Sequence, residues 1–136
     1  MLFVMILQSL VVTPANTIGQ LTRRGMLPSK VKIGPQVFSI SFRNPDEDGM
    51  LHDGTMGYTL DSGNIIVIAS SLPKTKQRVT LMHEILHAAR YTFENGMPKK
   101  NADYDEWEHY FIGIYENAIL MILDDNPELV EWLQDV

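Results

Sequence analysis

One helical turn constrains this chain more than any other feature of its sequence. His83 and His87 stand four residues apart, with Glu84 beside the first of them. In an α-helix, side chains four residues apart leave the same face, because one turn takes about 3.6 residues. Both imidazoles can therefore bind one metal ion. Glu84 leaves the helix at about 100° from His83, which places it to act as a general base on water rather than as a metal ligand.

The residues around this motif are mostly apolar. Positions 79–89 are largely aliphatic, and a helix that is apolar on all sides is expected to be buried. Burying two histidines and a carboxylate without partners would cost about 2 kcal/mol or more for each group. We therefore interpret the motif as a catalytic metal site rather than as a chance pattern on a surface helix. Zn²⁺ is the expected metal, because imidazole suits it and three protein ligands plus water complete a catalytic site.

Length, charge and cysteine usage narrow the class of protein. The 136 residues fit one domain with its own hydrophobic core. The chain has no cysteine, which excludes disulfides and thiolate zinc sites, so histidines and carboxylates must hold any metal. A net charge of −6 gives no basic footprint for nucleic acid. The charge therefore disfavours a nucleic-acid partner, and the sequence does not determine the oligomeric state.

The N-terminal segment has no clear place in this domain. Residues 1–12 are apolar, but they lack the basic start of a secretory signal and the 18 or so apolar residues of a membrane span. Three interpretations stay open: a membrane-tending segment, a buried element of the domain, or residues that precede a native start at Met26. The last follows from Arg23-Arg24-Gly25, which can be a translated ribosome-binding site. We therefore divide the chain into an uncertain segment 1–25 and a single domain 26–136, expected in the cytoplasm.

Three segments before the motif have the pattern of β-strands. Alternating apolar residues predict a strand over 31–42, with a bulge or break at Gly34-Pro35. Residues 56–60 and 65–69 flank Asp61-Ser62-Gly63-Asn64, a strong hairpin signal. The sequence therefore predicts a small antiparallel sheet of about three strands.

Helical segments follow the sheet. We predict a motif helix from about Lys74 to Arg90, with Pro73 in its first turn and a serine or Thr75 as its cap. A second helix should begin near Asp103 or Asp105 and end near Asp124, and a short helix over 129–133 should start near Pro127. The predicted fold class is α+β, with a small sheet packed on the motif helix and a second long helix.

A third metal ligand is expected from the second helix. The candidates in the whole chain are His52, Asp53, Asp103, Glu106, Glu108, His109 and Glu116. We predict that the buried face of the second helix is the stripe Phe111, Ile112, Tyr115, Ala118, Ile119, Ile122 and Leu123. Glu108 extends this stripe by one turn and is the preferred ligand. His109, about 100° away on a more polar side, is the alternative.

The order of these elements resembles a known group of enzymes. A β-hairpin, the helix with His83-Glu84-Ile85-Leu86-His87, and a second helix followed by Asp125-Asn126-Pro127-Glu128-Leu129 are similar to small phage and prophage zinc metallopeptidases. These resemble the minimal metallopeptidase domain of the ImmA/IrrE type. The resemblance covers about residues 31–133 and implies a minimal zincin-like fold with a gluzincin-like site, in which the third ligand is a glutamate on the helix after the motif. Because His109 follows Glu108, that glutamate carries over with an uncertainty of one residue.

The resemblance and the motif together imply hydrolysis of a peptide or protein substrate by metal-activated water, with Glu84 moving the proton. Tyr91, Tyr104, Tyr110 and His52 are candidate donors to the oxyanion. Two other functions remain open. The first is a zinc-containing interaction protein without catalysis, and the second is a zinc hydrolase acting on another amide, such as a cell-wall peptide. A scaffold would need a fourth protein ligand to close its site, which argues against the first.

Overall fold

The computed structural model describes residues 26–135. The segment 1–25, including the apolar run and the proposed start signal, and Val136 lie outside the described residues. The division of the chain at Met26 therefore stays a prediction. Among residues 26–135, none of the helices has the length and apolar character needed to cross a membrane.

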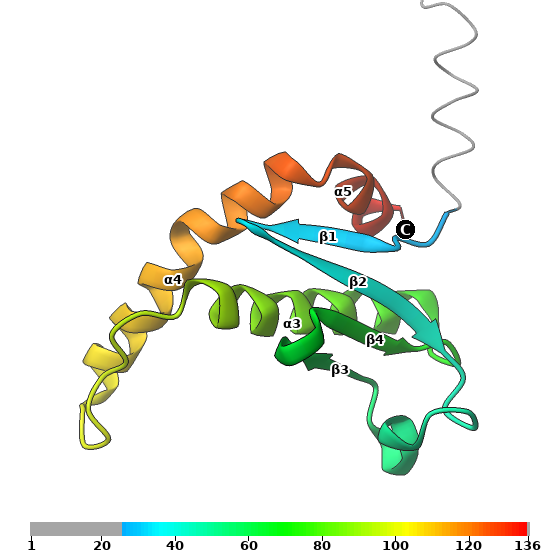
Figure 1. The fold of residues 1–136 in the computed structure, drawn as a ribbon, viewed down its shortest axis with the longest axis horizontal. Helices are drawn as coiled ribbons and strands as arrows, with labels where there is room; N and C mark the ends of the chain where they lie inside the picture. The colour runs from blue at the N-terminus through cyan, green and yellow to red at the C-terminus, as the bar shows by residue number, and fades with distance from the viewer. Residues whose placement is uncertain (1–25, 136) are drawn as a thin grey trace, which may run out of the picture.

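A sheet of four strands forms one side of the domain (Figure 1), which confirms the α+β class. The strands have the order β1-β2-β4-β3, with an antiparallel pair at each edge and a parallel pair in the centre. The bounds are β1 Lys30–Ile33, β2 Gln36–Arg43, β3 Gly57–Leu60 and β4 Ile65–Ala69, with 3₁₀ turns η1 at Gly49–Gly54 and η2 at Asp61–Gly63.

The prediction of about three antiparallel strands was wrong in two respects. The bulge or break expected at Gly34-Pro35 is a break, a tight turn, so residues 30–43 make a hairpin of two strands rather than one strand. Gly34 has φ +55°, and a Cβ there would lie 2.6 Å from the Phe93 ring, so only glycine fits this turn. The predicted hairpin of β3 and β4 is confirmed, but β4 inserts between β3 and β2 and runs parallel to β2.

The helices begin close to the predicted positions. They are α3 Lys74–Phe93, α4 Tyr104–Asp125 and α5 Pro127–Gln134. Asp103 caps α4 in a reciprocal pair with Glu106, as the acidic start suggested. The predicted side-chain cap of α3 was wrong, because Pro73 is the N-cap residue and no side chain bonds to the first turn.

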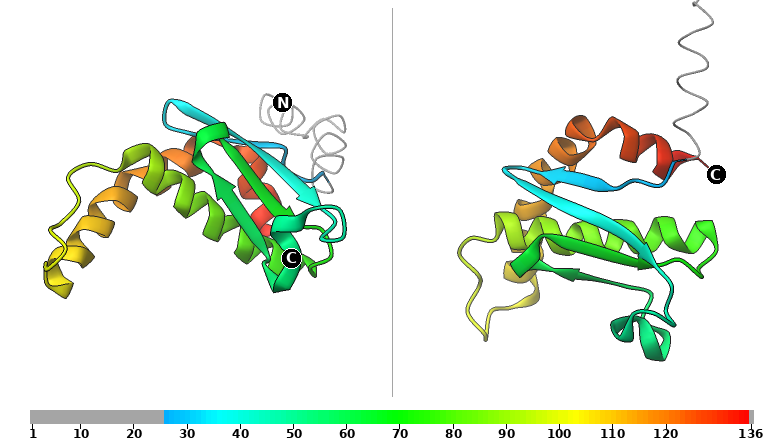
Figure 2. Two further views of the ribbon diagram at one scale, coloured as in Figure 1. Left: turned by 60° about the horizontal axis from the view of Figure 1, so that its bottom comes forward. Right: turned by 45° about the vertical axis from the view of Figure 1, so that its right-hand side comes forward.

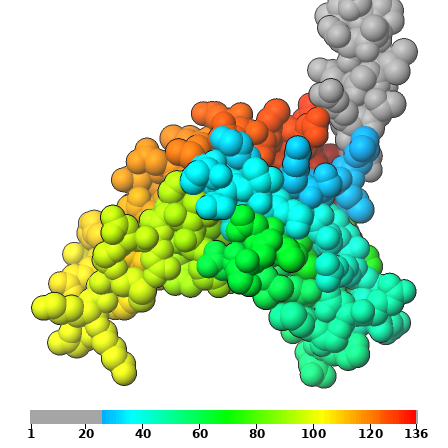
Figure 3. Space-filling model, in the orientation of Figure 1, coloured from blue at the N-terminus to red at the C-terminus, as the bar shows by residue number. Residues whose placement is uncertain are grey.

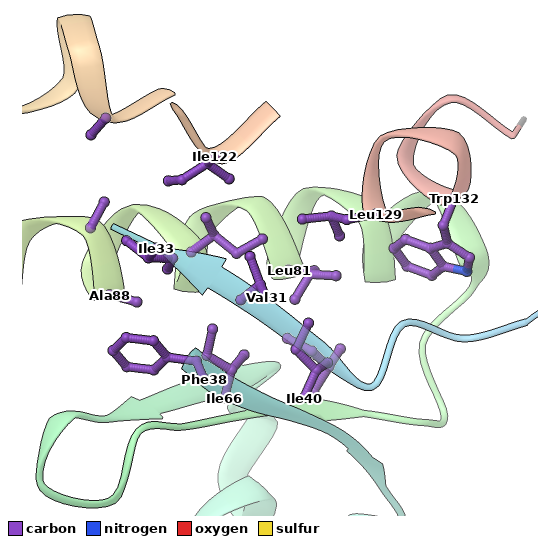
Figure 4. Close-up of a cluster of buried hydrophobic side chains, with 14 residues drawn as sticks. Val31, Ile33, Phe38, Ile40, Ile66, Leu81, Ala88, Ile122, Leu129 and Trp132 are labelled. Atoms are coloured by element: carbon purple, nitrogen blue, oxygen red, sulfur yellow. The ribbon is translucent and has the colours of Figure 1, made fainter. Parts of the chain in front are cut away.

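The hydrophobic core lies between the sheet and the helices (Figure 4). Alternate residues of β1 and β2 point into it, where they meet α3 and α5. Its largest fully buried side chains include Val31, Ile33, Phe38, Ile66, Leu81 and Ile85. On the opposite face of β4, Val67 and Ala69 form a second, smaller cluster with Leu51 of η1. Because β4 is buried on both faces, it is the centre of the domain.

The corner between α4 and α5 explains the Asp-Asn-Pro-Glu sequence. The Asn126 side chain accepts from the Lys32 backbone N–H at 2.8 Å and donates to the Lys32 carbonyl at 2.7 Å. It also donates to the carbonyl of Ile122 at 2.8 Å, and Asp125 pairs with the Lys32 ammonium at 3.2 Å. The amide thus pairs with the edge strand β1 as a neighbouring strand would. Pro127 then opens α5 at a position where no N–H is needed.

We expect Asn126→Ala to lower the free energy of unfolding by about 1–3 kcal/mol, because it leaves backbone groups of Lys32 and Ile122 without their partners. Urea unfolding followed by circular dichroism measures this loss. Asp124→Ala, two residues earlier and exposed, serves as the control and should change little. If the two variants unfolded at the same urea concentration, the amide would not be a structural contact.

Candidate metal centre

Helix α3, which carries the motif, is buried on one side only. It packs against β3 and β4, while α4 crosses its far end (Figure 2). Leu81, Ile85, Ala88 and Ala89 are buried against the sheet. His83 and His87 are exposed on another face, so the prediction of a helix buried all round was wrong. The cause is that this face of α3 is open among residues 26–135: Val79, one turn before His83, is 70% exposed.

The two histidines meet side by side on this open face. Their Nε2 atoms lie 3.1 Å apart, and their rings are in an edge-to-face arrangement with centroids 4.8 Å apart. Two nitrogens bound to one tetrahedral zinc, each at about 2.0–2.1 Å, would be separated by about 3.3 Å. The separation and the donor type therefore fit two ligands of one zinc ion.

Glu84 lies on the buried side of the motif, beside the edge strand β3. It is 6% exposed, and its Oε2 accepts a hydrogen bond of 2.7 Å from the Thr59 hydroxyl. The same hydroxyl lies 3.1 Å from the backbone carbonyl of Glu84. Gly57 lets β3 approach α3 this closely, because a Cβ there would lie 2.9 Å from the Thr80 side chain. The Glu84 carboxylate is therefore buried, as the sequence predicted, and it has a hydrogen-bond partner.

Thr59 is the residue of this site that sequence reasoning missed. The hairpin pattern places Thr59 in a strand, but only the tertiary packing of β3 on α3 brings it to Glu84. Nothing in the local sequence indicates that contact.

The predicted buried stripe of α4 was right only in part. Ala118 and Ile122 are buried as predicted, together with Ile114, whereas Phe111, Ile112, Ile119 and Leu123 are each more than a third exposed. The hydrophobic residues of α4 extend well beyond the face that packs, so the stripe chosen from the sequence was too wide and lay to one side of the buried face. Glu108, which was placed by that stripe, is exposed.

The third ligand remains a prediction. Among residues 26–135, no three or more histidine, aspartate or glutamate side chains come together as a group that could hold a metal ion. The structure therefore pairs His83 with His87 but adds neither Glu108 nor His109 to them. His109 lies with Nδ1 2.9 Å from the Asp105 carbonyl, a bond that raises its pKa. Metal-binding histidines commonly use their second nitrogen in this way, so His109 stays a chemically suitable alternative.

The candidate oxyanion donors lie at different distances from the motif. The Tyr91 ring stacks on His87 with centroids 6.4 Å apart, so Tyr91 is beside the pair. Tyr104 is 80% exposed at the start of α4, and His52 belongs to a separate hollow at η1. The Tyr110 hydroxyl is buried without a hydrogen-bond partner among the described residues, and this burial raises its pKa. Tyr91 is the only one of the four that the structure places against a motif residue in a ring contact.

The loop before β3 is tied to the sheet by a polar cluster. The Tyr58 hydroxyl donates to Asp48 Oδ2 at 2.7 Å, and Arg43 lies 3.3 Å from the same oxygen. Asp48 also accepts from the Met50 N–H at the start of η1. The Tyr58 hydrogen bond is the main cause of a pKa of Asp48 below its ordinary value. This cluster holds the segment between β2 and η1 against β3, the edge strand that contains Thr59.

Comparison with known proteins assigns the fold to a family. The profile of the IrrE N-terminal-like domain of peptidase M78 matches residues 32–131, which is most of the chain. No curated protein and no solved structure matches the chain. The matched region contains the whole sheet beyond the start of β1, the motif helix and α4. The chain belongs to the IrrE N-terminal-like domain family of peptidase M78, and its function is of the metallopeptidase type.

Proposed function

We propose that the protein is a zinc-dependent peptidase that hydrolyses peptide bonds, with His83 and His87 as zinc ligands. The observation that carries the proposal is the 3.1 Å separation of the two Nε2 atoms, with the buried Glu84 beside them. Bound zinc would supply a more acidic water and a Lewis acid for the scissile carbonyl. The family match supports a metallopeptidase, and the choice of zinc rests on the two imidazoles.

Glu84 is proposed as the general base. Glu84 Oε2 accepts a hydrogen bond from the Thr59 hydroxyl. Glu84 Oε1 is therefore the oxygen that remains to take a proton from the attacking water. Glu84 then delivers that proton to the leaving nitrogen. The Thr59 hydroxyl holds the carboxylate in place through both steps. A positioned carboxylate of this kind has no use in a purely structural zinc site, which favours an enzyme over an interaction scaffold.

The sequence resemblance alone suggests a relation to phage proteins and a location in the cytoplasm of a bacterial host. Hydrolysis of another amide, such as a cell-wall peptide, uses the same residues and is the second candidate.

The test is hydrolysis of a defined peptide mixture by the full chain, with new termini identified by mass spectrometry. We expect cleavage that a chelator removes and that added Zn²⁺, but not Mg²⁺, restores. A parallel incubation with purified peptidoglycan distinguishes the second candidate. Cleavage that survives complete removal of the metal would refute the proposal.

We further propose that α4 supplies the third ligand, with Glu108 preferred over His109. Glu108→Ala should then weaken zinc binding well beyond the ~10–100-fold cost of losing an outer-shell partner, and His109→Ala should not. Competition with a chromogenic zinc chelator measures both affinities. The reverse ranking would assign the role to His109. Unchanged affinity in both variants would exclude these two residues.

A further inference from the structure

An apolar groove runs along the exposed side of α4. It is a hollow of about 730 Å³, and its lining includes Trp107, Phe111, Ile112, Tyr115, Ile119 and Leu120. Leu120 is 61% exposed and Ile112 is 49% exposed. Trp107, Phe111 and Tyr115 form a stack of rings along it. The start of α4 projects from the body of the domain (Figure 3). A continuous apolar surface on a projecting helix is typical of a binding site.

This groove adjoins the face that carries the histidines. The Tyr115 hydroxyl donates to the Leu86 carbonyl at 3.3 Å, which joins α4 to the motif helix. Leu86 lines a second hollow, of about 540 Å³, together with Val79, Met82 and His83. Tyr115, which lines the first hollow, is thus hydrogen-bonded to Leu86, which lines the second beside His83.

The charge of α4 selects among possible occupants. Between Tyr104 and Asp125 the helix has acidic residues and no lysine or arginine, and Glu108 and Glu116 line the groove itself. Two copies of this surface would bring like charges together, which disfavours a dimer through it. An occupant with apolar and basic side chains satisfies both the rings and the carboxylates.

We propose that this groove binds the substrate, and that the substrate segment has one apolar face and lysine or arginine on the other. The inference rests on the proposed function and deepens it, because the groove leads to the proposed catalytic residues. The apolar side chains pack on the ring stack, while the basic ones pair with Glu116. The bound chain extends past Tyr115 toward the histidine pair.

Binding is measured apart from hydrolysis. The full chain with Glu84→Gln is titrated into a fluorescein-labelled 14-residue amphipathic peptide of leucine and lysine, and anisotropy reports the affinity. A peptide with glutamate in place of every lysine is the comparison. We expect the lysine peptide to bind at least ~10-fold more tightly, with an affinity that falls as salt rises.

Variants of α4 locate the binding surface. Ile112→Lys places a charge in the groove and should weaken binding of the lysine peptide at least ~10-fold. Met121→Lys is the matched control, because Met121 is 39% exposed on the same helix outside the groove, and it should bind as before. Glu116→Gln should weaken binding several-fold and reduce its salt dependence. Circular dichroism confirms that each variant is folded.

Several outcomes would overturn the inference. The first is equal binding of the two peptides, and the second is equal binding by Ile112→Lys and Met121→Lys. A concentration-dependent dimer lost in Ile112→Lys would assign the groove to a second copy. Peptide binding that appears only after Leu7→Lys would assign it to the chain's own apolar segment.

The zinc content of the same preparations, and hydrolysis by the chain with Glu84 unchanged, separate this inference from the proposed function. A zinc-loaded, hydrolysing chain that binds neither peptide refutes the groove alone. A chain that binds the lysine peptide but neither holds zinc nor hydrolyses any peptide refutes the enzyme.

Discussion

Glu84→Gln is expected to keep the fold and the zinc while reducing peptide hydrolysis by ~10²-fold to 10⁴-fold, the usual contribution of a general base. Glutamine has nearly the same shape, and its amide oxygen can still accept from the Thr59 hydroxyl. What it loses is the ability to take a proton. Because proton transfer follows binding, the loss should appear in kcat and leave KM nearly unchanged.

The measurement requires a cleaved peptide from the mixture assay, followed by initial rates over a range of its concentrations. Zinc content and thermal unfolding of Glu84→Gln must match those of the unchanged chain for the comparison to hold. Thr59→Ser is the matched control, because it keeps the hydroxyl that contacts Glu84 and should retain most of the rate. Equal kcat in Glu84→Gln and the unchanged chain would remove Glu84 from the mechanism.

The second large effect concerns the metal. His83→Ala and His87→Ala should each lower zinc affinity by more than the ~10–100-fold that loss of an outer-shell contact costs, because each removes a direct ligand. Both side chains are exposed, so neither change should unfold the domain. Removing either one leaves one imidazole and the proposed ligand from α4, which is fewer than the three protein ligands of a catalytic zinc site.

Equilibrium dialysis with metal analysis measures these affinities. His52→Ala is the control, because His52 lies in the separate hollow beside η1 and should leave zinc binding unchanged. If the two motif variants retained zinc as well as His52→Ala, the metal would be bound elsewhere in the chain.

Local sequence patterns predicted most of the secondary structure. The alternation of β2, the Asp61–Asn64 turn and the acidic start of α4 each involve residues close together in the chain, so the physics that forms them is visible in a short window. The His83–His87 pair belongs to the same class, because helical spacing alone brings the two rings together.

Relations between distant segments could not be predicted in this way. The parallel pairing of β2 with β4 depends on how the chain crosses between them, which no periodicity records. Burial was misjudged on α3 and α4 because both helices have more apolar residues than the domain covers. In α4 the additional apolar residues line the exposed groove. The residues that misled the choice of a buried stripe therefore form the proposed binding surface.

Stepwise addition of zinc to metal-free chain, with peptide hydrolysis followed at each step, tests the central claim most directly. We expect that hydrolysis rises with added zinc and stops rising at about one zinc per chain, because His83 and His87 form one site. The double variant His83→Ala, His87→Ala should remain inactive throughout. Hydrolysis by the metal-free chain, or by the double variant at any zinc concentration, would contradict the account.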